Sequence, residues 1–252
     1  MKIITLLATL LTTGLAFSAE TYELKVYHLN SADSAGQWDA WMSAAGLANL
    51  KKSGAGKVGA FRVRPADGEA DHRRFVLAVY PSPAALKPVD GAAVLPKQRN
   101  GKAEAYLAAP PKEPAYTRIE SSLLTAFPSF TRLEDPAGDG GKERFFELRI
   151  YENPSERAAA LKVEMFGQGG EIDIFREVGL KPVFFGSARI AVNPPQLTYL
   201  VVHENEEAQK AGWSGFGKSA GWAKLKKNTR YKGTVSKIHK HLLLALPFSE
   251  LK

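Results

Sequence analysis

The chain of 252 residues contains no cysteine. This absence excludes disulfide bonds, thiolate nucleophiles, cysteine-ligated zinc sites and iron–sulfur clusters. A chain of this length does not need the covalent links that stabilise small secreted domains, so the absence does not contradict export. Hydrophobic residues make up 44% of the sequence, which is ordinary for a globular protein with a substantial core.

Hydrolase signatures are also missing, since no Gly-x-Ser-x-Gly elbow occurs. The glycine-rich stretch Gly167-Gln168-Gly169-Gly170-Glu171 lacks the Gly-Lys-Ser/Thr ending of a phosphate-binding loop. It also lies between two predicted helices rather than after a strand, so we interpret it as a helix break. The catalytic residues are therefore unknown from sequence, and whether the protein is an enzyme stays open.

The N-terminal segment has the pattern of a secretory signal peptide. Met1-Lys2 precedes an apolar run over 3–11, and the small residues of 14–19 follow. The run is shorter than the roughly 20 residues that span a bilayer. Cleavage near Ser18 or Ala19 predicts a secreted or periplasmic protein with no integral membrane segment. A buried N-terminal strand or an uncleaved anchor is the alternative.

The formal net charge of +8 favours anionic partners without specifying a fold. The cations concentrate late in the chain, at Lys218, Lys224, Lys226, Lys227, Arg230, Lys232, Lys237 and Lys240. We interpret them as the solvated faces of a helix and a following strand. Because no motif places exposed aromatic residues among these cations, a nucleic acid is not an expected partner.

The chain is an internal duplication. The stretch Tyr22-Glu23-Leu24-Lys25-Val26-Tyr27 reappears about half a chain later as Phe146-Glu147-Leu148-Arg149-Ile150-Tyr151. Shorter matches pair Ala60-Phe61-Arg62-Val63 with Ser187-Ala188-Arg189-Ile190, and Val79-Tyr80 with Val202-His203. Such repeats constrain an architecture more than any single motif.

Each copy has the element order β-α-β-β-α-β. The first copy is predicted to have strands at 22–29, 58–63, 75–80 and 116–127, with helices after 31–34 and at 98–108. The second is predicted to have strands at 145–151, 183–191, 197–203 and 234–246, with helices at 155–166, 171–178 and 206–226. We divide the chain into a signal peptide (1–19), a first repeat (20–132), a Gly/Pro/Asp-rich linker (133–144) and a second repeat (145–252).

A four-stranded unit of this order covers only one face of its sheet with helices. Two tandem units bury their bare faces by packing them together. The predicted fold class is therefore α+β, with two ferredoxin-like (βαββαβ) repeats that form an intramolecular dimeric α/β barrel.

Strand alternation divides the side chains of each strand between two faces. We expect the apolar set Tyr22, Leu24 and Val26 to lie under the helices, and the polar set to face the barrel lumen. The candidate lumen residues are Glu23, Lys25, Tyr27, Arg62, Tyr80, Glu147, Arg149, Tyr151, Arg189 and His203.

Two interpretations of these polar residues stay open. Ion networks can simply fill the lumen, because confined charges must pair. Alternatively, the cations bind an anionic or carbonyl-bearing small molecule, with Tyr27, Tyr151 or His203 as a proton donor or acceptor. His239, His241 and His203 have the residue types of a zinc site, but solvated or core histidines explain this loose spacing better, because no tight ligand motif is present. No metal and no cofactor are therefore expected.

Several stretches of the second repeat resemble the NIPSNAP family. They are Phe145-Phe146-Glu147-Leu148-Arg149-Ile150-Tyr151-Glu152-Asn153-Pro154-Ser155-Glu156-Arg157, Met165-Phe166, Gly169-Gly170-Glu171-Ile172, Phe175, Pro182-Val183-Phe184-Phe185-Gly186, Leu197-Thr198-Tyr199-Leu200, Trp213-Ser214-Gly215-Phe216, Trp222 and Pro247-Phe248-Ser249. The resemblance covers about 145–250 closely and 22–130 more loosely. It implies a ferredoxin-like fold of the dimeric α/β-barrel superfamily, whose members include small monooxygenases and haem-degrading or haem-using enzymes. NIPSNAP proteins themselves have no settled catalytic activity.

Our first hypothesis is an exported tandem NIPSNAP protein of no established reaction that binds a small molecule or a partner. The alternative is a monooxygenase- or isomerase-like enzyme acting on a small aromatic or carbonyl compound. A lumen filled by aromatic and ion-paired side chains argues against the enzyme, whereas an open pocket beside Tyr27, Arg149, Tyr151 and His203 argues for it. The sequence does not specify the oligomeric state.

Overall fold

The computed structural model describes residues 18–65, 71–88, 101–135 and 144–252. Most of the predicted signal peptide, the core of the predicted linker and the first residues of the helix predicted at 98–108 lie outside these ranges. The described residues form two repeats of four strands each, as the duplication predicts.

The first repeat consists of β1 (Thr21–Leu29), α1 (Ala32–Trp41), a π-helical turn (Met42–Gly46), α2 (Leu47–Lys52), β2 (Lys57–Val63), β3 (Arg74–Tyr80), a short 3₁₀ turn (Pro83–Ala85), α3 (Gly101–Leu107) and β4 (Tyr116–Ala126). The second consists of β5 (Phe145–Glu152), α4 (Glu156–Phe166), α5 (Glu171–Glu177), β6 (Lys181–Ile190), β7 (Gln196–His203), α6 (Glu206–Lys218), α7 (Ala220–Leu225), η4 (Thr229–Tyr231) and β8 (Lys237–Ala245).

Side-chain caps begin the main helices in equivalent ways. Ser31 accepts a hydrogen bond from the backbone N–H of Ser34 at the start of α1, and Ser155 does the same for Ala158 at α4. The single helix expected over 206–226 is instead two. Ser219 has an extended backbone, and its hydroxyl accepts from the N–H of Trp222, so it ends α6 and caps α7.

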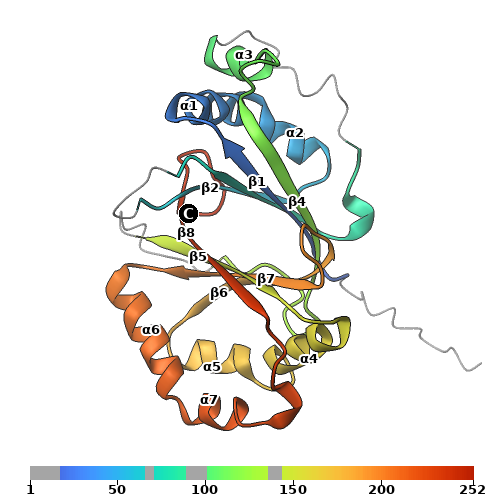
Figure 1. Cartoon of the computed structure of the whole chain (residues 1–252), viewed down its shortest axis with the longest axis vertical. Coiled ribbons are helices and arrows are strands. Elements are labelled where there is room, and N and C mark those ends of the chain that lie inside the picture. Colours follow the sequence, from blue (N-terminus) through green and yellow to red (C-terminus); the bar gives the residue numbers. More distant parts are fainter. Residues whose placement is uncertain (1–17, 66–70, 89–100, 136–143) are drawn as a thin grey trace, which may run out of the picture.

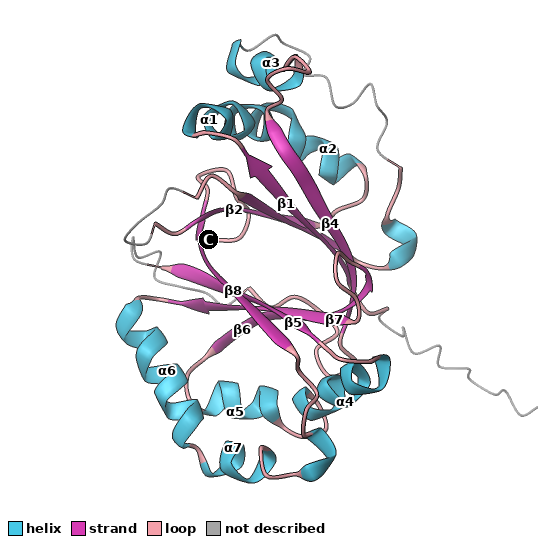
Figure 2. Cartoon of the chain, viewed as in Figure 1, coloured by secondary structure: helices cyan, strands magenta, loops and turns pink. Residues whose placement is uncertain are grey.

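The strands close into one barrel in the order β1-β3-β2-β8-β5-β7-β6-β4, and neighbouring strands pair antiparallel. The two repeats join where β2 pairs with β8 and where β4 pairs with β6. Helices α1–α3 lie on one side of the barrel and α4–α7 on the opposite side (Figure 1). Figure 2 shows the strands enclosed between these two helical layers. The predicted intramolecular dimeric α/β barrel is therefore confirmed.

The predicted assignment of strand faces is wrong. Tyr22, Leu24 and Val26 face the lumen, where they form one apolar cluster with residues of both repeats. The ring of Tyr22 lies 4.8 Å from that of Phe184, and Phe61 lies 5.0 Å from Phe146. Strands surround a closed barrel interior on every side, so it is drier than the space beneath the helices, where helical side chains supply polar partners.

Candidate functional site

The ten predicted lumen residues lie instead on the outer, helix-facing side of the strands. Glu23, Lys25, Tyr27, Arg62 and Tyr80 alternate with lumen residues in the first repeat, and Glu147, Arg149, Tyr151, Arg189 and His203 do so in the second. Two of them join no common site. Arg62 is half-buried on β2, and the exposed Arg189 donates to the Thr125 hydroxyl at 3.3 Å.

Glu147 is the centre of a buried hydrogen-bond network in the second repeat. Its side chain is 0% exposed and accepts from Arg149 at 2.6 Å and from His203 Nε2 at 3.2 Å. Two further donors come from α6: Gln209 at 2.7 Å and the indole N–H of Trp213 at 2.9 Å. Burial works to raise the pKa of Glu147, but the hydrogen bonds and the charge of Arg149 outweigh it and lower the pKa to about 2. The carboxylate is therefore a fixed negative charge.

Arg149 is positioned by this carboxylate and by an aromatic ring. Its guanidinium carbon lies 3.8 Å from the centroid of the Trp213 ring, and its Nε donates to Glu147 at 2.7 Å. Glu147 and Trp213 thus hold the arginine between β5 and α6. Arg149 also lines a cavity, so it presents a positive charge to that space.

The cavity has a volume of about 470 Å³ and lies between the outer face of the second sheet and helices α4–α7. This is within the range of small-molecule sites. Its lining residues are Arg149, Tyr151, Lys162, Met165, Glu171, Phe175, Tyr199, Trp213, Phe216, Trp222, Lys226, Tyr231, Lys232, Gly233, Thr234, Val235 and Ile238. We call it the aromatic cavity, because Phe175, Trp213, Phe216 and Trp222 form a continuous ring cluster on one wall.

Two tyrosines provide the hydroxyl groups of the aromatic cavity. The hydroxyl oxygens of Tyr151 and Tyr199 lie 2.9 Å apart and share a hydrogen bond. Burial raises the pKa of Tyr199 well above its usual value, so this phenol stays protonated. Burial also raises the pKa of Tyr151, against the lowering effect of the Arg149 charge. Both groups therefore serve as hydrogen-bond donors at neutral pH.

A buried ion pair lies at the side formed by α4 and α5. Lys162 Nζ is 2.6 Å from Glu171 Oε2, and it also lies 4.3 Å from the centroid of the Phe166 ring. Neither Lys162 nor Glu171 was a sequence candidate, because helical lysines and glutamates are usually solvated. Glu171, Trp213 and Trp222 do belong to the stretches over 145–250 that resemble the NIPSNAP family. That resemblance is the sequence signal that could have marked them as candidate site residues.

The equivalent space in the first repeat is filled by aromatic rings. Tyr27, the counterpart of Tyr151, packs 5.1 Å from Trp38, and Trp41 stacks 5.0 Å from Tyr106. Glu23 still pairs with Lys25, at 2.9 Å. The duplicated strand therefore keeps its ion pair in both repeats, while the aromatic cavity belongs to the second.

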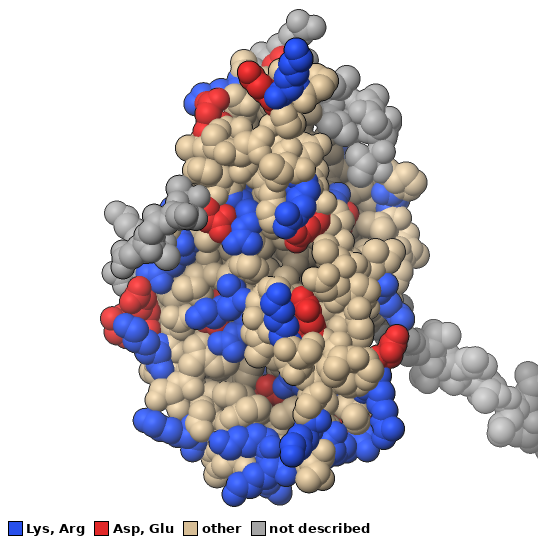
Figure 3. All heavy atoms as spheres, in the orientation of Figure 1, with Lys and Arg blue, Asp and Glu red and all other residues tan. Residues whose placement is uncertain are grey.

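A basic face borders the aromatic cavity. No Asp or Glu occurs between Glu207 and Glu250, a stretch that carries the late cations. Figure 3 shows Lys and Arg side chains gathered over α7 and η4 at this end of the molecule. We define the basic face as the exposed residues Lys218, Lys224, Lys226, Lys227, Arg230 and Lys232. Lys226 and Lys232 also line the cavity, so the basic face reaches its rim.

The fold shows how three histidines and one further sequence motif are placed. His203 faces the helices, whereas His239 and His241 face the lumen side, so these three histidines form no common zinc site. Within the described ranges, no group of three or more His, Asp or Glu side chains is arranged to hold a metal ion. The stretch 212–219 matches the phosphate-loop pattern Gly-x₄-Gly-Lys-Ser, but most of it lies within α6, where the helix uses the backbone N–H groups.

No family model matches the chain, and no curated protein matches it. Among solved structures, it is similar to a candidate monooxygenase from Lactobacillus acidophilus NCFM, with 12% identity, 90% of this chain and 94% of that chain covered, and a TM-score of 0.55. A candidate monooxygenase from Fusobacterium nucleatum has 11% identity, coverage of 91% and 94%, and a TM-score of 0.57. These likenesses establish the dimeric α/β-barrel fold.

The solved structures also include an uncharacterised NIPSNAP-like domain protein from Burkholderia xenovorans. It is 22% identical, covers 42% of this chain and 89% of its own, and has a TM-score of 0.36. NIPSNAP-like neighbours therefore match less than half of the chain. Among the described residues, no helix is both long enough and apolar enough to cross a membrane.

Proposed function

We propose that the second repeat binds a small planar aromatic anion in the aromatic cavity. The observation that carries this proposal is the placement of Arg149 beside a ring-lined space of about 470 Å³. Aromatic walls favour a flat apolar body, and a single oriented cation favours a carboxylate or phenolate. One of the two tyrosine hydroxyls donates to the other, and the remaining O–H offers an additional donor to the same oxygen atoms.

The charges around the cavity agree with an anionic ligand. Glu147 accepts from Arg149 and from three further donors, so its negative charge is shared among several partners and is not aimed at the cavity alone. Glu171 is paired with Lys162. The basic face at the rim raises the local concentration of anions before they enter. Together these features favour an anion over a cation or a neutral molecule of the same shape.

The test compares 2-naphthoate with its neutral amide by isothermal titration calorimetry. We expect the carboxylate to bind about tenfold or more tightly, because a charge-assisted hydrogen bond contributes about 1.5–3 kcal/mol. Arg149→Gln should remove this preference. Lys25→Gln, at the equivalent position of the first repeat, is the matched control and should leave it unchanged.

A second pair of variants tests whether the ligand binds in the aromatic cavity. Ile238 lines the aromatic cavity and is 51% exposed, so Ile238→Trp should obstruct entry without disturbing the core. Ile190 is 65% exposed on β6 and does not line the cavity, so Ile190→Trp is the control. Equal binding of the carboxylate and the amide, or equal effects of the paired variants, would contradict the proposed site.

An oxygenase of the dimeric α/β-barrel type is the second candidate. Two solved structures that match 90% and 91% of this chain are described as candidate monooxygenases, which motivates the test. In such a reaction, an activated aromatic CH₂ group would react with O₂ to give a carbonyl group and water. Arg149 would stabilise the negative oxygen formed when the substrate loses its proton. Oxygen uptake with anthrone, lost in Arg149→Gln but retained in Lys25→Gln, would support this candidate.

The tandem NIPSNAP assignment and export remain our proposals as well. Both rest on the sequence: the resemblance over 145–250 and the signal-peptide pattern of 1–19. Mass spectrometry of the protein recovered from expressing bacterial cells would detect cleavage after Ser18 or Ala19. An intact N-terminus in a fractionated extract would argue against export.

A further inference from the structure

The lumen-facing side chains change from apolar to polar at one end of the barrel. On β1 the series is Leu24, Val26, His28, and on β8 it is Leu243, His241, His239. Strand β4 continues from Leu124 through Ser122 to Glu120 and Arg118, and Arg73 precedes the lumen residue Phe75. The apolar centre of the lumen is thus closed, while this mouth is lined by histidine, arginine and carboxylate groups.

The mouth contains a second cavity, of about 300 Å³. Leu24, Val26 and Ile150 supply its apolar floor, toward the centre of the lumen. Its polar wall comes from strands of both repeats: His28, Arg73, Arg118, Glu120, Ser122, Glu152, Gln196, His239 and His241. No lining residue is shared with the aromatic cavity, so the two spaces are separate.

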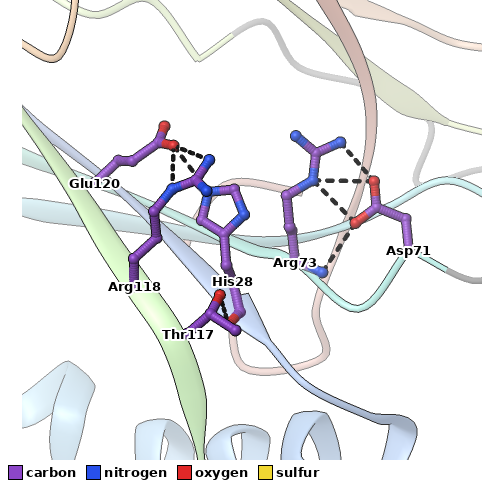
Figure 4. A network of polar contacts seen from close by, with 6 residues as sticks. All are labelled: His28, Asp71, Arg73, Thr117, Arg118 and Glu120. Carbon is purple, nitrogen blue, oxygen red and sulfur yellow. Dashed lines mark hydrogen bonds and ion pairs between the residues drawn. The ribbon is translucent and has the colours of Figure 1, made fainter.

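Most charged groups at the mouth already have a partner. Arg73 binds the carboxylate of Asp71, while His28 and Arg118 both contact Glu120, at 3.0 Å and 2.6 Å (Figure 4). On the opposite side, His239 lies 2.6 Å from Glu152, which also accepts from Asn193 at 3.1 Å. These pairs fix the positions of the charges around the cavity.

His241 differs from them, because its ring nitrogens form no hydrogen bond with any residue that the structure describes. Its ring lies 5.1 Å from that of Phe75. Burial, together with the charges of Arg73 and His239, lowers the pKa of His241 to about 4 against the smaller raising effects of Asp71 and Glu120. The potential at this imidazole is therefore positive, which favours a bound anion.

We propose that the mouth of the lumen binds a small aliphatic carboxylate, with its oxygens at His241 and Arg73 and its carbon chain on Leu24, Val26 and Ile150. The guanidinium of Arg73 and the ring of His241 offer N–H donors on the wall, and the floor offers an apolar surface to the chain. The available volume limits the chain to a short one. The site is independent of the aromatic cavity.

Binding of a carboxylate at this site should be accompanied by the uptake of a proton by His241. A carboxylate beside His241 stabilises the imidazolium and raises its pKa, so binding is coupled to protonation. Affinity therefore increases as the pH falls, by up to about tenfold per unit between the pKa of His241 in the complex and its lower pKa in the free chain. His28, His239, Arg118, Glu120 and Glu152 also line this cavity, and Asp71 binds the guanidinium of Arg73. The proton uptake must therefore be assigned to His241 by a measurement on its own ring.

The experiment titrates hexanoate into the full chain between pH 7.5 and pH 5.5, by calorimetry in two buffers of different ionisation enthalpy. We expect net proton uptake, and a rise in the pKa of the His241 ring measured by ¹⁵N NMR. His241→Gln should abolish the uptake, and Arg73→Gln should weaken binding about tenfold or more. His72→Gln changes a neighbouring histidine that does not line the cavity, so it should behave as the unmodified chain does.

Several results would overturn this proposal: no hexanoate binding, binding without proton uptake, or an unchanged pKa of His241 in the complex. The NMR measurement on the unmodified chain keeps the test decisive if a variant folds poorly. Arg149→Gln should leave hexanoate binding intact. Loss of binding in that variant would place hexanoate in the aromatic cavity and would also overturn the proposal.

Discussion

Lys162 and Glu171 form an ion pair of 2.6 Å whose side chains are only 5% and 4% exposed. The pair links α4 to α5 beside the aromatic cavity. Burial raises the pKa of Glu171, while the charge of Lys162 acts in the opposite direction. Each charge is thus tolerated in this dry environment because the other is present.

Removing one member of this pair should be strongly destabilising. We expect Glu171→Gln or Lys162→Met alone to lower the free energy of unfolding by about 3–5 kcal/mol, because a buried charge is left without its partner. The double variant Lys162→Met/Glu171→Leu should recover much of that loss. Urea denaturation measures each value. Lys210→Met, which removes an exposed pair with Glu206, is the control and should cost less than about 1 kcal/mol.

Glu147 should make stability depend on acid. Its folded pKa of about 2 lies below the value of 4.5 expected when exposed. The carboxylate therefore stabilises the folded state above pH 4.5, and this contribution is lost as the pH falls toward 2. The full loss corresponds to about 3 kcal/mol. Glu147→Gln should flatten this part of the profile, measured by urea denaturation at successive pH values, whereas the exposed Glu207→Gln should leave the slope unchanged.

The architecture was predictable because two independent sequence signals agree. The repeated strand of Tyr22–Tyr27 and Phe146–Tyr151 indicates a duplication, and each copy has too few helices to cover both faces of its sheet. Closure into one barrel follows from these facts. The break at Ser219 was missed because its effect depends on a side-chain cap rather than on hydrophobic periodicity.

The orientation of the strands could not be predicted from alternation. A period of two shows that Glu147, Arg149 and Tyr151 share a face, but not which layer that face meets. The partners that decide it, Gln209 and Trp213, come from α6, some sixty residues later in the chain. Glu147, Arg149, Tyr151 and His203 lie together on the outer face of the second sheet, so their predicted placement in the lumen was wrong. Their role in ligand binding stays a prediction.

The contact between Phe61 and Phe146 should couple the two repeats. Their rings meet edge to face at 5.0 Å in the centre of the lumen, and each side chain is nearly inaccessible. Phe61→Ala should lower the free energy of unfolding by about 3–5 kcal/mol, because it leaves a cavity in a closed core. Chemical denaturation followed by fluorescence measures this loss. Ile190→Ala, at an exposed position, should change stability by less than about 0.5 kcal/mol.

The basic face should accelerate ligand entry to the aromatic cavity. The triple variant Lys224→Glu/Lys226→Glu/Lys227→Glu reverses charges at or near the rim, so it should slow the association of 2-naphthoate about three- to tenfold at low salt. The difference should disappear near 1 M salt, where the Debye length is about 3 Å. Trp213 and Trp222 line the cavity, so stopped-flow quenching of tryptophan fluorescence reports the rate.

The matched control reverses the same number of charges in the first repeat, at the exposed residues Lys52, Lys87 and Lys112. It gives the protein the same net charge but leaves the basic face intact. If both triple variants slow association equally, the overall charge rather than the basic face attracts the ligand. A slower rate confined to the first variant and to low salt is the expected result, because steering depends on charge close to the entrance.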